Sequence, residues 1–491
     1  MWLGPWRHCS EQASGLKWCT TAKCLGIVFS SACCASEIDV NWSKKYCKMK
    51  NILSSWAPRN LSLIGKITVL KNLVASQLPY SFGALIPPDS FLKDVNLMFY
   101  RFIWKRDRVK RNVMVQDYSK GGLKMIDIRI MHKCCLLRSI QKLLSSSETP
   151  TPTWKKIQLY HFNKFGPDLC ILKHNCTAVQ VSSNVSLAPL PLYYRKLILT
   201  WYETKPVQNV NDIDQVNWQL LWNNVCISYK GNMLYFDKWI RRHILYVNDI
   251  VDDQGKFISF DDVKANAHVL LQYNALMNSV PKQWKGVSRL DNEKAPSIKL
   301  CGKDIRSQDS TFFKNICIMQ YQSVPVSQNF WEKRFPLYDF HSISWNVLWK
   351  SPFLATKEPK LISMQWKILH NIYPTRILLY KMRIVENNKC SFCDNIDYIE
   401  HFFFDCKTVK PLWDYVESLF SHSLSLNVHH IIFGYNLHML NKSRYINQLL
   451  LVAKLSIVKF KFTLSASNSL NLDPQTLLKV FKSECSVRNL I

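Results

Sequence analysis

Four cysteine and histidine residues near the C-terminal end constrain the fold of this chain more than any other feature. Thiolates and imidazoles are the ligands that tetrahedral zinc prefers, and a C-x2-C turn presents two sulfurs to one ion. Four protein ligands leave no position for a reactive water, so the pattern predicts a structural Zn2+ rather than a catalytic one. We also expect the three phenylalanines at 402–404 to pack beneath the site as a small core. The predicted ligands, with the spacing C-x2-C-x7-H-x4-C, are Cys390, Cys393, His401 and Cys406.

Two other interpretations of these residues stay open. The chain has 17 cysteines, so the cluster is also compatible with free thiols that lie beside a histidine of the core. The pair Cys390 and Cys393 further has the C-x-x-C spacing of a redox site, although no βαβ pattern surrounds it. The order Cys, Cys, His, Cys matches a zinc knuckle and favours the metal.

The charge balance of the chain favours a polyanionic partner. Its 64 Lys and Arg residues exceed its 35 Asp and Glu residues, and the formal net charge at pH 7 is +29. Each phosphate that a basic side chain neutralises releases a counterion, which favours the binding of nucleic acid. We therefore expect RNA, an RNA–DNA hybrid or DNA as the partner. A basic protein with no partner and an anionic membrane surface are the alternatives.

Basic residues are densest between residues 44 and 124, where 16 Lys and Arg stand against four Asp. Helical spacing in this basic tract places charged side chains opposite an apolar face. Such a surface suits a sugar–phosphate backbone, and the interleaved Trp42, Trp56, Trp104 and Tyr118 either stack on bases or belong to the core. The candidate nucleic-acid-binding residues are Arg59, Lys66, Lys105, Arg106, Arg108, Lys110 and Arg111.

No motif in the sequence predicts catalysis. The chain has 13 Gly and contains neither G-x-x-x-x-G-K-[ST] nor G-x-G-x-x-G, the phosphate-binding loops. Adjacent carboxylates, which polymerases use to hold two metal ions, occur at Asp252-Asp253 and Asp261-Asp262. Neither pair lies in an apolar strand–turn–strand pattern, and neighbouring side chains of a strand point to opposite faces. We therefore expect no catalytic residue and no enzymatic activity of the chain by itself.

The cysteines indicate a reducing compartment. They are odd in number and scattered, and some are adjacent, such as Cys33 and Cys34, which is unlike a secreted disulfide framework. The apolar run from Cys24 to Ala35 is interpreted as a strand rather than a signal peptide. No apolar run reaches the roughly 18 residues that cross a bilayer. We expect an intracellular protein of the nucleus or cytoplasm that is neither secreted nor bound to a membrane.

The periodicity of apolar residues predicts a mainly α, multi-domain helical protein with a short N-terminal β remnant and a small CCHC zinc-binding module. Strands are expected at 16–19 and 25–29, a helix over 263–273, and a final helix over 446–462. The expected domains are a residual β-ribbon over 1–36, a basic helical domain over 37–145, a helical connector over 146–340, and a C-terminal helical domain over 341–491 with the zinc module at 385–420.

Several segments, taken in order, resemble the C-terminal part of LINE-type, non-LTR retrotransposon reverse transcriptases. These segments are W-A-P-R-N-L-S-L-I-G-K-I (56–67), F-I-W-K (102–105), K-G-G-L (120–123), Q-W-K-I-L-H (365–370), Y-P-T (373–375), C-S-F-C with E-H-F-F-F-D-C (390–406), and L-L-L-V-A-K (449–454). The likeness covers nearly the whole chain and is loosest over residues 150–340. It implies that the basic domain is thumb-like and grips a template–primer duplex, and that the zinc module binds template RNA.

The same resemblance implies what this chain lacks. The family's endonuclease, fingers and palm would precede Met1, and residues 1–36 resemble the end of the palm. No catalytic residue is carried over, since the polymerase aspartates would also lie upstream. The leading hypothesis is a non-enzymatic fragment or domesticated remnant that binds RNA or an RNA–DNA hybrid. The alternatives are part of an active RNA-directed DNA polymerase whose catalytic domains are encoded upstream or supplied by another chain, and an untranslated pseudogene product.

Overall fold

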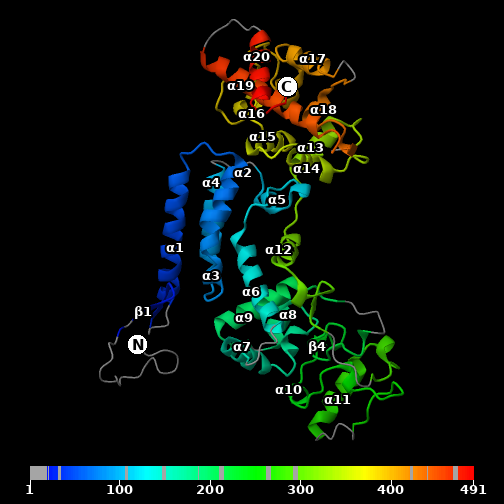
Figure 1. The fold of residues 1–491 in the computed structure, drawn as a ribbon. Coiled ribbons are helices and arrows are strands. Elements are labelled where there is room, and N and C mark those ends of the chain that lie inside the picture. Colours follow the sequence, from blue (N-terminus) through cyan, green and yellow to red (C-terminus); the bar gives the residue numbers. More distant parts are fainter. Residues whose placement is uncertain are drawn as a thin grey trace. The chain divides into compact units, whose positions relative to one another are not determined.

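Helices dominate the computed structural model, as the sequence predicts (Figure 1). Three two-stranded antiparallel sheets are the sheets found among the described residues. Among the residues that the structure describes, no helix is long and apolar enough to cross a membrane. The structure describes residues 19, 21–30, 35–104, 109–145, 151–185, 187–208, 215–260, 267–290, 297–420, 424–439, 441–467 and 474–490.

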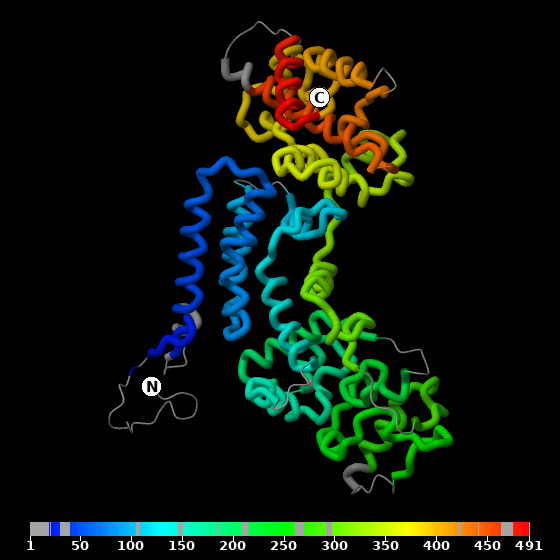
Figure 2. The backbone as a smooth tube through the Cα atoms, in the orientation of Figure 1, coloured from blue at the N-terminus to red at the C-terminus, as the bar shows by residue number. Residues whose placement is uncertain are grey.

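The chain divides into two compact units, each assembled from segments that are distant in the sequence. The first unit comprises Met1–Ile38, Leu78–Pro88 and Arg129–Gln320, and the second comprises Asp39–Gln77, Asp89–Ile128 and Tyr321–Ile491. Residues 37–145, which we expected in one basic domain, therefore contribute to both units. Figure 2 follows the chain as it passes from one unit to the other and back.

The first unit contains the three hairpins and a set of mostly short helices. Its elements are β1 (Thr21–Cys24), β2 (Ile27–Ser30), α3 (Pro79–Phe82), α6 (Ile128–Ser145), α7 (Thr153–Asn163), η5 (Cys170–Leu172), α8 (Ala178–Asn184), α9 (Leu192–Thr204), β3 (Ser228–Tyr229), β4 (Asn232–Met233), α10 (Asp237–Ile240), η7 (Val247–Asp249), α11 (Ala267–Ser279), η8 (Lys282–Trp284), β5 (Lys299–Leu300), β6 (Lys303–Asp304), η9 (Ile305–Ser307) and α12 (Ser310–Met319).

The N-terminal hairpin β1–β2 differs from the expected strands in where its strands begin and end. Leu25 and Gly26, which we placed inside a strand, form the turn between Cys24 and Ile27. Both have positive φ, 46° and 82°, as a two-residue hairpin turn requires. The strand expected at 16–19 lies outside the described residues except for Cys19. The helix expected over 263–273 is α11, and positions 263–266 lie outside the described residues as well.

A tryptophan-rich core holds the connector region of the first unit together. Trp222 and Trp239 are buried, and their ring centroids lie 6.1 Å apart. The indole of Trp222 donates a hydrogen bond to the carbonyl oxygen of Ile244 at 2.8 Å. Trp284 closes the same cluster. Residues 150–340, where the family resemblance is loosest, therefore form a packed structure within the described ranges.

The second unit contains nearly all of α1 and every element after α12. Its elements are α1 (Ala35–Trp56), α2 (Leu63–Val69), the π-helix η2 (Leu70–Val74), η3 (Ala75–Gln77), α4 (Asp89–Ile103), α5 (Arg111–Val115), η4 (Tyr118–Lys120), α13 (Val326–Arg334), α14 (Trp345–Ala355), α15 (Pro359–Leu369), α16 (Arg376–Lys381), the π-helix η10 (His401–Asp405), α17 (Lys410–Ser418), α18 (Val428–Phe433), η11 (Leu437–Met439), α19 (Arg444–Ser467) and α20 (Pro474–Ser486).

Helix α15 is the element on which the distant segments of the second unit converge. The carbonyl oxygen of Gly121 accepts a hydrogen bond from the Trp366 indole at 3.0 Å and lies 2.8 Å from Nε2 of His370. The ring of Trp104 stacks on that of Trp366 at 6.3 Å. The segments F-I-W-K, K-G-G-L and Q-W-K-I-L-H thus meet in one place.

Two further contacts complete this convergence. The backbone N–H of Ile64, in α2, points to the hydroxyl of Ser363 at 3.5 Å. From α19, the buried Lys454 donates hydrogen bonds to the Gln365 amide oxygen and to the Ile431 carbonyl oxygen. Segments 56–67 and 449–454 therefore pack on the same helix.

The turn at Gly121-Gly122 explains why two glycines stand together. Gly121 has a φ of +76°, a backbone conformation that favours glycine. A Cβ atom on Gly122 would lie 2.0 Å from the carbonyl oxygen of Gln116, closer than any side chain permits. The two glycines let the backbone fold onto itself and bring the Gly121 carbonyl to α15.

The last helix differs from the expectation. We expected the chain's final helix over 446–462, whereas α19 covers Arg444–Ser467 and a further helix, α20, follows at Pro474–Ser486. Helix α20 packs along α19 and buries Leu477, Phe481 and Cys485.

Candidate metal centre and nucleic-acid interface

The four predicted ligands lie together in the second unit. Cys390 and Cys393 occupy a tight turn, where the N–H of Cys390 donates to the Asn395 carbonyl at 2.7 Å. Asp394 takes a φ of +58° and reverses the chain after the second thiol. His401 begins η10, and Cys406 directly follows that helix. A turn and one short helix therefore bring all four side chains to a single point.

The distances among these side chains suit a tetrahedral ion. The four possible ligand atoms all lie within 4.8 Å of one another. The Sγ of Cys406 lies 3.9 Å from that of Cys390 and 3.8 Å from that of Cys393. Zinc–sulfur bonds of about 2.3 Å at tetrahedral angles separate two sulfurs by about 3.8 Å. The Cys393 Sγ and His401 Nε2 are 3.1 Å apart, roughly 0.5 Å closer than this geometry gives.

Burial and a neighbouring cation shape the electrostatics of the thiols. Cys390, His401 and Cys406 are buried and Cys393 is half-buried. The hydrogen bond between the thiols of Cys390 and Cys406 lowers the pKa of Cys406 and raises that of Cys390. The positive charge of Lys461 favours the thiolate forms of both and lowers their pKa. Without a metal ion, Cys406 is therefore the thiol that these surroundings favour as a thiolate, while Cys390 keeps its proton.

Lys461 is a residue of this site that the sequence analysis missed. It is 4% exposed, and its ammonium donates to the Phe402 carbonyl at 2.9 Å. The same ammonium lies 4.3 Å from the centre of the Phe402 ring. It comes from α19, which is distant in sequence, so no local pattern placed it near the cysteines.

The aromatic residues around His401 form the core that we expected beneath the site. Phe402 and Phe403 are buried, and Phe404 is half-buried against the same cluster. The Trp413 indole donates to the Phe403 carbonyl at 2.8 Å. The centre is therefore fixed to the main core of the second unit.

The candidate nucleic-acid-binding residues have different surroundings. Lys105, Arg106 and Arg108 lie outside the described residues. Arg59 and Lys110 are exposed. These two keep the surface position that phosphate binding requires, and the assignment of the whole set stays a prediction.

Lys66 and Arg111 are engaged in contacts within the second unit. The Lys66 ammonium donates to the Ile103 carbonyl at 3.1 Å and so caps the end of α4. The Arg111 guanidinium is half-buried and lies 5.5 Å from the centre of the Tyr100 ring. Lys66 therefore has a structural role that the sequence pattern did not indicate.

The aromatic residues of the basic tract belong mostly to the core. Trp42 and Trp104 are buried, and the Trp42 ring lies 4.8 Å from that of Phe91. Trp56 is half-buried at the end of α1, with the Arg59 guanidinium 4.0 Å above its ring. Tyr118 is half-buried, and the Lys124 ammonium lies 4.6 Å from the centre of its ring.

The adjacent aspartates at 252–253 lie in a turn. One Asp252 oxygen accepts the backbone N–H groups of Gln254 at 2.9 Å and Lys256 at 2.8 Å. The turn joins Val251 to Phe257, which form an isolated antiparallel bridge. The pair Asp261-Asp262 lies outside the described residues.

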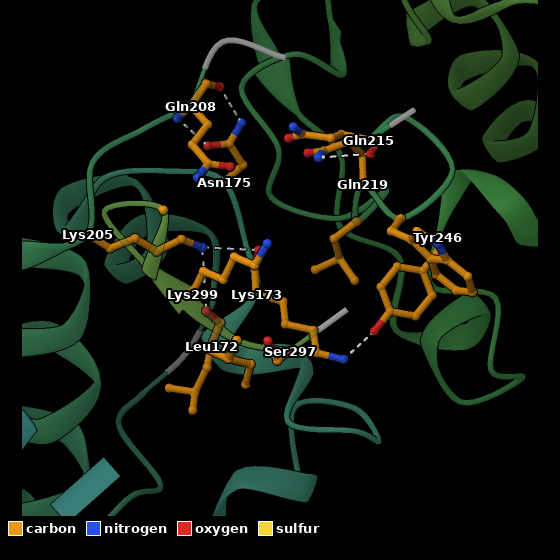
Figure 3. A pocket seen from close by; sticks show the side chains of 14 residues that line it. Leu172, Lys173, Asn175, Lys205, Gln208, Gln215, Gln219, Tyr246, Ser297 and Lys299 are labelled. Atoms are coloured by element: carbon orange, nitrogen blue, oxygen red, sulfur yellow. Dashed lines mark hydrogen bonds between the residues drawn. The ribbon is translucent and has the colours of Figure 1, made fainter. Parts of the chain in front are cut away.

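A polar pocket of about 430 Å³ lies in the first unit (Figure 3). Its Lys205 ammonium donates to the carbonyls of Lys173 at 3.2 Å and His174 at 2.7 Å. Burial lowers the pKa of Lys205 to about 8. The Lys173 ammonium bonds the Tyr246 hydroxyl, and Asn175 bonds the Gln208 backbone. These polar groups stabilise the local backbone.

Comparison with known proteins agrees with this geometry. Residues 312–413 match the family model described as zinc-binding in reverse transcriptase, a range that contains α15 and all four Cys and His residues. The chain is therefore related, through its C-terminal region, to retrotransposon reverse transcriptases, as the resemblance of its motifs predicts.

One relative is the transposon TX1 uncharacterized 149 kDa protein of Xenopus laevis. It is 24% identical over 456 residues, which cover 81% of this chain and 34% of the relative. The chain thus spans about a third of the length of that protein.

Proposed function

We propose that this chain is a nucleic-acid-binding part of a retrotransposon reverse transcriptase, that it binds RNA or an RNA–DNA hybrid, and that a structural zinc ion stabilises it. The observation that carries the proposal is the Cys3His cluster, which lies inside the range matching a reverse-transcriptase zinc-binding family. By itself the chain performs no nucleotidyl transfer, since none of its motifs supplies the paired aspartates of a polymerase.

The arrangement of the cluster supports a structural role for zinc. Three thiolates and one imidazole fill a tetrahedral shell and leave no position for a catalytic water. When bound, the ion would hold the turn of Cys390 and Cys393 against η10. The buried ammonium of Lys461 offsets the single negative charge that three thiolates and Zn2+ would carry together.

Charge and exposure support nucleic acid as the partner. The net charge of +29 favours a polyanion, and Arg59 and Lys110 are exposed cations of the basic tract. Phosphate contacts of this kind fix position and carry little sequence information. The binding is therefore tolerant of sequence.

Salt dependence tests this proposal directly. A duplex contact by one cation contributes about −0.9 to the slope of log affinity against log salt. The double variant Arg59→Ala, Lys110→Ala should flatten that slope by up to about 2 for any duplex sequence. The matched control replaces the exposed Lys357 and Lys360 of the same unit by Ala. If both double variants show the same salt slope as the unaltered chain, Arg59 and Lys110 do not contact phosphates and the assignment of the basic tract is wrong.

The second candidate is part of an active RNA-directed DNA polymerase. The length of the TX1 relative, of which the chain covers 34%, favours it. Primer extension with the purified chain, Mg2+ and nucleotides separates the two candidates. We expect binding of the template–primer without extension, and template-dependent synthesis would contradict the non-enzymatic proposal.

A further inference from the structure

A second pocket of the first unit, about 760 Å³ in volume, lies among α3, α6, α7 and α9. Among the residues that line it are Arg138, Lys142, Trp154, Gln158 and Tyr194. No residue of its lining is acidic. Its walls thus combine cations, aromatic rings and an amide, which together suit a nucleotide.

Gln158 is the residue that distinguishes this pocket from the polar pocket of Figure 3. In Figure 3 the ammonium groups of Lys173 and Lys205 and the amide of Asn175 donate hydrogen bonds to neighbouring groups. The Gln158 side chain is 2% exposed, and its Nε2 has no hydrogen-bond partner among the described residues. A buried donor without a partner destabilises the folded state. A ligand that supplies an acceptor in the pocket would remove this destabilisation.

The aromatic wall is provided by Trp154, one turn before Gln158 on α7. Residues four apart on a helix lie on the same face, so the indole and the amide face one space. The Trp154 side chain is 43% exposed, which leaves its ring accessible. Tyr194 from α9 is held in place by His161, with ring centroids 4.7 Å apart.

Positive charge surrounds the same pocket. Arg138 and Lys142 are four residues apart on α6, and both are exposed. Over residues 129–208 the sequence has eleven Lys and Arg against three Asp and Glu. A flexible polyanion is therefore attracted to this side of the unit.

We propose that this pocket binds an unpaired base of a single-stranded nucleic acid. The base stacks on Trp154, the Gln158 amide donates to an acceptor on the edge of the base, and Arg138 and Lys142 neutralise adjacent phosphates. The pocket lies in the first unit, whereas Arg59 and Lys110 of the basic tract lie in the second. The inference shares with the proposed function the requirement that the chain binds nucleic acid.

The test compares single-stranded and duplex RNA as probes of the full chain. We would measure the affinity for a labelled single strand of about 12 nucleotides and for a blunt duplex of the same sequence. Stacking of one base contributes about 1–3 kcal/mol, so Trp154→Ala should weaken single-strand binding at least about five-fold. Duplex binding should change less than about two-fold. Tyr160→Ala is the matched control, because Tyr160 is 65% exposed on the same helix and does not line the pocket.

Gln158→Leu provides an independent readout. Because its donor has no partner, its removal should leave the free energy of unfolding unchanged or higher while it weakens single-strand binding. The inference is overturned if Trp154→Ala weakens the binding of single strand and duplex equally. It is also overturned if Trp154→Ala binds the single strand as tightly as Tyr160→Ala does. If the chain binds neither probe, the proposed function fails as well, whereas binding of both without dependence on Trp154 refutes the pocket alone.

Discussion

The buried lysine of α19 gives a quantitative prediction about pH. Lys454 is 2% exposed, and burial alone lowers its pKa from 10.5 to about 7. Below pH 7 the folded chain must hold a buried ammonium, which opposes folding. Between pH 7 and 10.5 the unfolded chain binds more protons than the folded one, so the free energy of unfolding rises with pH. Each pH unit in this window contributes up to about 1.36 kcal/mol. Because the folded group is half protonated at pH 7, the gain from pH 7 to pH 9 is about 2.3 kcal/mol.

The variant Lys454→Met removes this titration and keeps an apolar stem of similar length. Urea unfolding of the second unit, followed by tryptophan fluorescence at pH 7 and pH 9, measures the effect. The unaltered chain should gain about 2 to 3 kcal/mol relative to Lys454→Met over that interval. Cysteines also titrate in this range, but they are common to both proteins and cancel in the difference. Parallel pH profiles of the two proteins would refute the reasoning.

Three further predictions follow from the second unit. The chain should bind one zinc ion, and the double variant Cys390→Ser, Cys393→Ser should lose it by elemental mass spectrometry; unchanged content would place the ion elsewhere. Lys461→Met should weaken zinc affinity about ten-fold in competition with a chelator, since groups that support the ligands from behind commonly contribute this much. Unaltered affinity would show that Lys461 does not balance the charge of the site. Gly122→Ala should destabilise the unit by about 3 kcal/mol, because its Cβ would meet the Gln116 carbonyl at 2.0 Å. Gly65→Ala in α2 is the control and should be tolerated. Equal free energies of unfolding for the two variants would contradict the close approach at Gly122.

The sequence predicted the mainly helical fold and the residues of the metal cluster because both depend on local patterns. The four ligands lie within 17 consecutive positions, so one turn and one short helix suffice to join them. The segment that forms helix α20 has a similar local signal. Leu477, Phe481 and Cys485 recur every four residues and are buried, and Pro474 marks its first turn.

Contacts between distant segments could not be predicted in this way. The approach of Lys461 to the cluster depends on how α19 packs, which no spacing within 390–406 records. Charge alone also failed to separate the surface cation Arg59 from Lys66, whose ammonium binds the end of α4. Both residues read as basic positions of one tract, and only the packing of α4 distinguishes them.

Several segments that resemble the reverse transcriptase family pack on α15, and their burial shows that these motifs specify the fold rather than a binding surface. Four of the segments that carry the resemblance contact α15, among them those that contain Gly121, Trp104 and Lys454. The side chains of Trp104 and Lys454 are buried there. Such residues specify how the second unit folds, and a buried side chain cannot reach a phosphate. If the proposed function holds, contacts with nucleic acid come from exposed cations at the edges of these motifs, such as Arg59 and Lys110, or from sites outside them, such as the Trp154 pocket. For this reason the binding experiments target exposed side chains, while the stability experiments target α15 and its partners.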